Sequence, residues 1–169
     1  MELFTITILL AIFGTFAYAG YKGAPWVPTR KDDVSAIIDA LKLNKDSVFC
    51  DIGCGDGRLT IAAAERGARA TGLEISLLPY IIAHIRRLFS PARSRVQIRY
   101  KNLWHTDLSD TTHVYFFLMP EMFPKLMEKL KKELKPGSIV LSYVWPLPQW
   151  VPTEVIKREK QPTLYLYTI

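Results

Sequence analysis

Residues 50–58 read CDIGCGDGR, and they stand between a short apolar run at 47–52 and a helical pattern at 59–66. Three glycines within five residues permit a sharp turn and let a ligand approach bare backbone. A loop that opens a helix also directs unpaired N–H groups toward an anion. The stretch therefore predicts a strand–loop–helix unit, with a ligand site at the carboxyl end of the strand.

Strand-like and helical segments alternate along the chain on both sides of this loop. Strands are expected at residues 47–52, 69–75, 95–101, 112–118 and 138–145, and helices at 31–43, 59–66, 76–89 and after Pro120. Two further strand-like runs, 153–158 and 163–169, are separated by an expected turn at Gln161 and Pro162. This order predicts an α/β fold with a doubly wound, mostly parallel seven-stranded sheet that a hairpin closes at one edge.

Two acidic residues indicate the class of ligand. The glycine spacing is GxGxG, whereas dinucleotide sites use GxGxxG, and Asp51 stands two positions before Gly53. A carboxylate there would repel a pyrophosphate but suits a ligand with an ammonium and a sulfonium group, such as S-adenosylmethionine (SAM). Glu74 follows Gly53 by 21 residues, a spacing that places an acid on ribose hydroxyls. Together they predict a SAM site.

Composition limits the partners. The chain has 169 residues, which favours one domain, and 22 Lys and Arg against 16 Asp and Glu give a net charge of +6. A basic chain favours an acidic partner, a membrane surface or nucleic acid. Because the basic residues lack interleaved stacking aromatics, no nucleic-acid partner is expected. Cys50 and Cys54 lack the companions of a zinc site, so no metal is expected.

The N-terminal residues form an uncharged apolar segment. Nineteen residues between Glu2 and Lys22 carry no charge, and as a helix they would reach ~28 Å, close to the ~30 Å hydrocarbon core of a bilayer. We expect a transmembrane anchor over 1–21 that contacts lipid through 3–21, a linker over 22–30 and a catalytic domain over 31–169. Basic residues follow the segment, which places the domain on the cytoplasmic (or mitochondrial matrix) side. A cleaved signal peptide is the alternative.

Several segments together carry a family resemblance. The stretches DIGCGDGR at 51–58 and GLEI at 72–75 resemble the cofactor motifs of class I SAM-dependent methyltransferases. With VPT at 27–29, NLW at 102–104 and LMP at 118–120, the chain is similar to the small protein-lysine methyltransferases. That family includes a broad-specificity archaeal enzyme and mitochondrial enzymes that act on the ATP synthase c subunit and the adenine nucleotide translocase. The resemblance spans about residues 24–150.

The resemblance implies SAM as the cofactor and assigns its contacts. Residues 27–29 would cover the methionine end, Glu74 would hold the ribose, and Leu103 and Trp104 would flank the adenine and the methyl group. Asn102 departs from the pattern, because many members of the wider class I methyltransferase superfamily carry an aspartate there that faces the adenine amine. The full implied set is Val27, Pro28, Thr29, Asp51, Gly53, Cys54, Gly55, Asp56, Gly57, Glu74, Ile75, Asn102, Leu103 and Trp104.

The acceptor is expected near residues 116–121. Met119, Pro120 and Glu121 follow the fourth strand and are the candidates for positioning an acceptor amine. A lysine amine must lose a proton before methyl transfer, and a dry, apolar channel lowers its pKa. The leading hypothesis is a membrane-anchored protein-lysine N-methyltransferase that acts on a membrane protein. The alternatives are methylation of a small molecule, quinone or lipid head group, and SAM binding without turnover.

Overall fold

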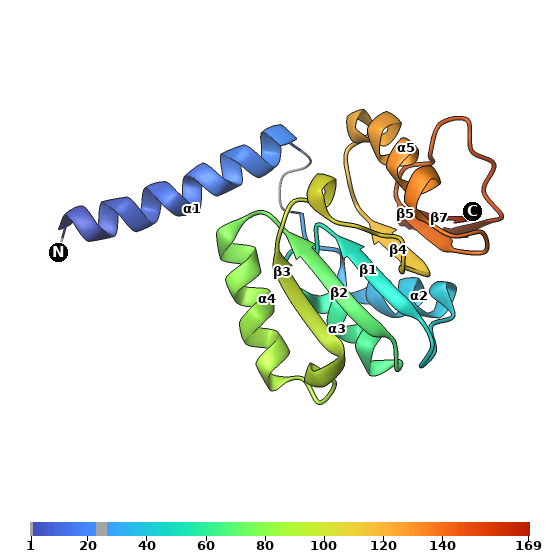
Figure 1. The fold of residues 1–169 in the computed structure, drawn as a ribbon, viewed down its shortest axis with the longest axis horizontal. Helices are drawn as coiled ribbons and strands as arrows, with labels where there is room; N and C mark the ends of the chain where they lie inside the picture. The colour runs from blue at the N-terminus through green and yellow to red at the C-terminus, as the bar shows by residue number, and fades with distance from the viewer. Residues whose placement is uncertain (1, 23–26) are drawn as a thin grey trace.

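The computed structural model describes residues 2–22 and 27–169, and the expected linker over 22–30 therefore lies in part outside the described residues (Figure 1). The α-helices are α1 (Glu2–Lys22), α2 (Lys31–Leu41), α3 (Arg58–Glu65), α4 (Leu77–Phe89) and α5 (Phe123–Glu133). The strands are β1 (Val48–Ile52), β2 (Arg69–Glu74), β3 (Val96–Tyr100), β4 (His113–Phe116), β5 (Ile139–Tyr143), β6 (Glu154–Arg158) and β7 (Gln161–Thr168). Short 3-10 helices occupy Arg93–Arg95, Leu103–His105 and Pro120–Met122.

The strands form one seven-stranded sheet in the order β3-β2-β1-β4-β5-β7-β6. Neighbours among β1 to β5 are parallel, whereas β7 runs antiparallel to both β5 and β6. The predicted doubly wound sheet and its closing hairpin are confirmed. The expected turn at Gln161 and Pro162 is wrong by two residues. The chain turns at Glu159 and Lys160, where Lys160 adopts a φ of 55°, so that β7 already begins at Gln161.

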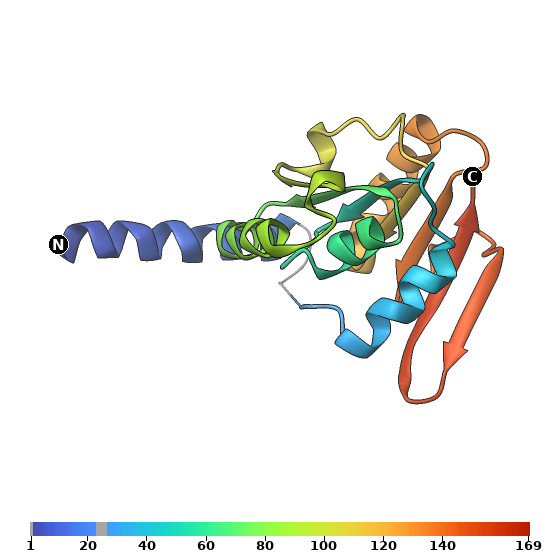
Figure 2. The ribbon, with the colours of Figure 1, turned by 90° about the horizontal axis from the view of Figure 1, so that it is seen from below.

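Helices cover both faces of the sheet (Figure 2). On one face α2, α3 and α4 pack against alternate strand residues such as Phe49, and on the other α5 packs against the intervening residues such as Cys50. This alternation follows from the period of two along a strand. The alternation directs Asp51 toward α3, where the Thr60 hydroxyl donates a hydrogen bond to its carboxylate.

The strand order reverses between β1 and β4, because β2 and β3 extend the sheet on one side and β4 and β5 on the other. Ligands of doubly wound sheets bind beyond the carboxyl ends of the strands at such a reversal. The glycine-rich loop after β1 and the segments after β2, β3 and β4 therefore meet at one edge of the sheet.

Helix α1 contacts the domain next to α4 and otherwise projects away from it. The Leu77 N–H donates a hydrogen bond to the Thr15 hydroxyl at 3.1 Å, and α1 then extends beyond the domain in both views (Figures 1 and 2). In the described part of the chain, no helix combines the length and the hydropathy that a membrane crossing requires. The expected transmembrane anchor over 1–21 is therefore not supported.

Candidate functional site

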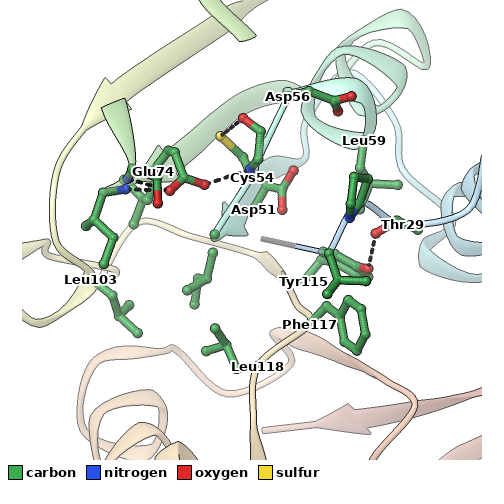
Figure 3. A pocket seen from close by; sticks show the side chains of 18 of the residues that line it. Thr29, Asp51, Cys54, Asp56, Leu59, Glu74, Leu103, Tyr115, Phe117 and Leu118 are labelled. Carbon is green, nitrogen blue, oxygen red and sulfur yellow. Dashed lines mark hydrogen bonds between the residues drawn. The ribbon is translucent and has the colours of Figure 1, made fainter. Parts of the chain in front are cut away.

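A cavity opens at the carboxyl ends of the parallel strands (Figure 3). The space between its lining atoms measures about 980 Å³ with its solvent opening included. Five segments supply its walls: 27–29, the loop and helix start at 51–59, the end of β2 and its loop at 73–76, residues 101–104, and residues 115–122. The sheet topology thus brings the predicted motifs to one place.

All but one of the predicted cofactor residues line this cavity. They are Val27, Pro28, Thr29, Asp51, Gly53, Cys54, Gly55, Asp56, Glu74, Ile75, Asn102, Leu103 and Trp104. Gly57 does not line it. It precedes α3 with a φ of 75°, and a Cβ there would lie 2.9 Å from the Ala83 Cβ. The absence of a side chain at Gly57 therefore lets the loop pack closely against α4.

Asp51 is the buried carboxylate at the centre of the cavity. Its side chain is only 1% exposed, and the Thr60 hydroxyl donates to its Oδ2 at 2.7 Å. Burial raises the pKa of Asp51 to about 7, and the negative charge of Glu74 adds to this against the hydrogen bond from Thr60. A buried carboxylate of this kind is stabilised by a cationic ligand.

Glu74 is oriented by backbone N–H groups from both sides. Its Oε1 accepts from Ile75 at 2.8 Å and Ser76 at 2.7 Å, and its Oε2 accepts from Gly55 at 2.9 Å. Oε2 therefore keeps acceptor capacity for a ligand hydroxyl. The carboxylate also fixes the glycine-rich loop against the end of β2, so it shapes the site.

Asp56, the third acid of the cavity, is neutralised within the protein. Arg58 contacts it through Nη2, and the Arg86 Nη1 lies 2.8 Å from its Oδ2. Burial alone would raise the pKa of Asp56, but the hydrogen bonds and charges of these arginines hold it below its ordinary value. Figure 3 shows Asp56 apart from the Asp51 and Glu74 carboxylates. Asp56 thus orders the loop and leaves the other two acids to the ligand.

The 27–29 segment is fixed to the opposite wall. The Thr29 Oγ1 and the Tyr115 phenol oxygen lie 2.9 Å apart in a hydrogen bond, and the Arg58 Nη1 donates to the Thr29 carbonyl at 2.8 Å. Tyr115 stands opposite Asp51 in the register of β1 and β4. These contacts hold the segment over the cavity beside Asp51 (Figure 3).

The segment after β3 supplies the third wall. The Asn102 Oδ1 accepts from the Trp104 N–H at 3.0 Å and so caps the short 3-10 helix. One of the two acceptor positions on the Asn102 oxygen is therefore used within the chain. Leu103 is buried, and the Lys125 Nζ lies 4.4 Å from the centre of the Trp104 ring. These residues form an apolar surface suited to a planar base.

The three predicted acceptor-positioning residues, Met119, Pro120 and Glu121, are exposed and do not line the cavity. Strand β4 ends at Phe116, and the following 3-10 helix turns residues 119–121 outward. Their neighbours Tyr115, Phe117, Leu118 and Met122 form that wall instead. The period of two along β4 would have identified Tyr115 and Phe117, because both share the face of Asp51.

The two cysteines are ordinary buried thiols. Burial raises the pKa of Cys50 to about 12 and that of Cys54 well above its usual value. Neither is therefore a thiolate nucleophile at neutral pH. Among residues 2–22 and 27–169, no group of three or more His, Cys, Asp or Glu side chains is arranged to hold a metal ion.

SAM fits the chemistry of this cavity. Its ammonium and sulfonium charges match the buried Asp51 carboxylate, and its ribose hydroxyls match the remaining acceptor capacity of Glu74. The wall at 102–104 suits the adenine ring.

The Glu74→Gln variant should bind SAM about ten- to a hundred-fold more weakly, the range of one hydrogen bond to a charged group. In the wild-type protein, backbone N–H groups donate to both oxygens of the Glu74 carboxylate. In the variant, the amide nitrogen cannot accept these hydrogen bonds, so the side chain loses its fixed orientation. Isothermal titration calorimetry measures the change, with the exposed Glu128→Gln as the matched control. An unchanged dissociation constant would remove the ribose role of Glu74.

SAM affinity should fall as pH drops below 7. The pKa of Asp51 is about 7 in the unliganded protein, and the cationic ligand requires its ionised form. The dissociation constant should therefore rise by up to about ten-fold per pH unit in acid. Calorimetry between about pH 5.5 and 6.8 keeps the ligand ammonium almost fully protonated, because an α-amino group titrates near about pH 8. A flat profile for the wild-type protein would contradict this account, whereas Asp51→Asn should be flat.

Comparison with known proteins gives the family. A family model, the ANTKMT methyltransferase domain, matches residues 51–154. The chain is 36% identical over 152 residues to a protein-lysine N-methyltransferase of Saccharolobus islandicus, covering 86% of this chain and 93% of that protein. It is 30% identical over 133 residues to the human lysine N-methyltransferase named for the c subunit of ATP synthase, covering 78% of this chain and 56% of that relative. The chain thus spans a little over half the length of the human relative.

A solved structure agrees with this assignment. The crystal structure of an RNA methyltransferase from Salinibacter ruber in complex with S-adenosyl-L-homocysteine superposes with a TM-score of 0.81 at 31% identity. The match covers 85% of this chain and 94% of that one. The family model, the archaeal relative and the cavity together show that the chain belongs to the ANTKMT methyltransferase domain family and is a SAM-dependent methyltransferase.

Proposed function

We propose that this methyltransferase acts on the side-chain amine of a protein lysine. The observation that carries the proposal is the apolar wall beside Asp51, formed by Phe117, Leu118 and Met122. An extended, uncharged amine on an alkyl chain matches such a wall. The names of the archaeal and human relatives, both lysine N-methyltransferases, support the same acceptor.

The cavity can perform this transfer by positioning and desolvation. Bound SAM supplies a methyl group activated by its sulfonium, and the protein has to align an amine lone pair with it. The apolar wall lowers the pKa of an entering lysine, so the amine arrives neutral. Of the described residues that line the cavity, none is a histidine, and Asp51 and Glu74 are committed to the cofactor. The proton is therefore released to solvent as the lysine enters the apolar channel.

Tyr115 contributes a neutral hydroxyl to this wall. Burial raises its pKa well above the usual value, and the nearby charge of Asp51 acts in the same direction. Its hydrogen bond to Thr29 fixes the phenol beside the 27–29 segment. Tyr115 and Thr29 thus lie between the cofactor site and the acceptor channel. The Phe117 ring lines the same wall and excludes water from it.

The substrate we propose is a membrane-associated protein, reached because α1 associates with a lipid bilayer through residues 3–21. Leu3, Phe4, Leu10 and Phe13 are exposed apolar side chains on α1. Relatives named for the ATP synthase c subunit and for the adenine nucleotide translocase support this substrate class. Association would raise the effective concentration of substrate. The domain would then lie on the cytoplasmic or mitochondrial matrix side.

RNA methylation is the second candidate, because the similar structure from Salinibacter ruber is that of an RNA methyltransferase. The lysine proposal is favoured by the apolar acceptor wall, since an RNA base would be recognised by stacking and by polar groups at its edge. The two functions leave the methyl group on different molecules, so one experiment separates them.

The test uses the full chain, methyl-labelled SAM, and separate membrane-protein, lipid and RNA fractions from cells that lack the enzyme. We expect label in methyl-lysine after hydrolysis of the protein fraction, and none with the Asp51→Asn variant. Label in nucleosides would establish the RNA function instead. Label in lipid or quinone would establish small-molecule methylation. Absence of label in every fraction, with SAM binding confirmed, would overturn the lysine proposal.

A further inference from the structure

The outer face of α4 is apolar and exposed. Ile81, Ile85 and Leu88 are between 41% and 52% exposed, and Phe89 is 84% exposed. Their spacing places them along one stripe of the helix. The opposite side of α4 packs on the sheet and on α3, with Ala83 buried. Nothing in the described part of the chain covers this stripe, so it is available to a partner.

The segment that carries the stripe is basic in sequence. Residues 77–101 contain no Asp or Glu, and their six basic residues are Arg86, Arg87, Arg93, Arg95, Arg99 and Lys101. Arg86 pairs with Asp56, and the Arg87 Nε donates to the Val96 carbonyl. Arg93 and Arg95 are exposed on the 3-10 helix that follows α4. An apolar stripe bordered by cations is the composition of a surface that binds anionic lipid.

The position of α1 connects this surface with the proposed bilayer association. In Figure 1 α1 runs past the N-terminal end of α4, and in both views it extends beyond the domain, away from the sheet (Figures 1 and 2). The hydrogen bond from the Leu77 N–H to the Thr15 hydroxyl joins the two helices at this point. A bilayer that receives the exposed side chains of α1 would therefore lie on the α4 side of the domain.

We propose that the α4 face, defined as Ile81, Ile85, Leu88 and Phe89 with Arg93 and Arg95, docks on the surface of an anionic lipid bilayer. The apolar stripe enters the interface between head groups and acyl chains, and the two arginines contact lipid phosphates. RNA would leave the apolar stripe without a matching surface.

Docking also orients the catalytic site. Helix α4 begins directly after Ile75 and Ser76, which line the cofactor cavity. A bilayer against α4 and α1 therefore holds the cavity near the membrane surface, where the lysine of a membrane protein would enter. The inference rests on the proposed bilayer association and is independent of the lysine acceptor.

An environment-sensitive dye at position 89 tests this docking in the full-length protein. The Phe89→Cys variant is labelled with a nitrobenzoxadiazole dye, and the buried, high-pKa thiols of Cys50 and Cys54 stay unlabelled. The matched control is Val151→Cys, because Val151 is 88% exposed in the segment before β6, the strand at the far edge of the sheet. The probe is a vesicle of phosphatidylcholine with about one quarter phosphatidylglycerol.

We expect the dye at position 89 to shift its emission to shorter wavelength and to be quenched by spin-labelled acyl chains, and the dye at position 151 to do neither. Arg93→Gln with Arg95→Gln should weaken binding to these vesicles about five-fold or more. Lys157→Gln with Lys160→Gln, at the far edge of the sheet, should leave binding unchanged. Both pairs are exposed in the structure.

Three results would overturn the docking proposal. If the protein sediments with vesicles while the dye at position 89 stays unchanged, α1 binds lipid without the α4 face. If the dye responds to protein concentration or to RNA instead of vesicles, the partner is a second copy or a nucleic acid. If the full chain does not bind vesicles, the bilayer association itself fails. None of these readouts depends on methyl transfer, so failure of the lysine assignment is seen separately.

Discussion

Asp51→Asn should weaken SAM binding by about a hundred-fold or more near pH 7.5, because removing one partner of a buried charge pair costs about 3–5 kcal/mol. The substituted asparagine would be a neutral side chain of the same shape, and its carbonyl oxygen can still accept the Thr60 hydroxyl that now donates at 2.7 Å. The loss would therefore come from the missing charge. Calorimetry measures it, with the exposed Asp46→Asn as control.

The same substitution should make the unliganded protein more stable in mild alkali. The pKa of Asp51 is raised from 3.8 to about 7 in the folded protein, so the folded state binds more protons than the unfolded state between these values. The free energy of unfolding therefore falls as pH rises through this window, and the substitution removes that fall. Thermal unfolding at about pH 8 should show a higher midpoint for Asp51→Asn than for wild type. A lower midpoint together with lost binding would make Asp51 a structural residue.

The fold was predictable because its signals are local. The apolar runs and the helical spacing identified all seven strands and the four helices that pack on the sheet, mostly within one or two residues. Asp51 and Glu74 were predictable because they stand near the carboxyl ends of neighbouring parallel strands, whose loops converge in one cavity. The contacts from residues 27–29 and 102–104 were expected only from the family resemblance.

The acceptor wall was less predictable because it depends on where β4 ends. The sequence extends the strand to residue 118, but β4 ends at Phe116, and the 3-10 helix at Pro120–Met122 turns the next residues outward. The role of Gly57 depends on its distance from Ala83 on α4, a contact between elements that no local pattern encodes. The family resemblance places Gly57 among the cofactor contacts, but in the structure Gly57 packs close to Ala83 and does not line the cavity.

Local sequence patterns also could not predict a buried cluster of charged and polar groups. Asp33 is fully buried on α2, its carboxylate accepts from the Tyr143 hydroxyl, and the Arg158 Nη1 donates to its Oδ1 at 2.6 Å. These partners are 110 and 125 residues away in sequence. The Tyr143 ring also packs edge-on against Phe117 of the acceptor wall, with ring centres 4.9 Å apart. The cluster thus joins α2 and the closing hairpin to the wall of the cavity.

Gly72→Ala should damage both the fold and the cofactor site, because Gly72 lies opposite Asp51 in the pairing of β1 and β2. A Cβ at Gly72 would lie 2.7 Å from the Cys54 Sγ and 2.8 Å from the Thr60 Oγ1. Both side chains are buried, so they cannot move aside freely. Overpacking of this kind costs about 1–3 kcal/mol in the free energy of unfolding.

The site should fail for a specific reason, namely that the displaced Thr60 hydroxyl no longer holds the Asp51 carboxylate. We expect Gly72→Ala to weaken SAM binding about ten-fold or more, as expected when a hydrogen bond to a charged group is lost. Gly137→Ala is the control, since Gly137 has a φ of 88° with nothing within 4 Å of an added Cβ. Its cost is backbone strain alone, about 1–2 kcal/mol, with SAM affinity unchanged. Chemical denaturation and calorimetry on both variants separate the two effects. Wild-type affinity in a destabilised Gly72→Ala protein would show that the cofactor site does not depend on Thr60.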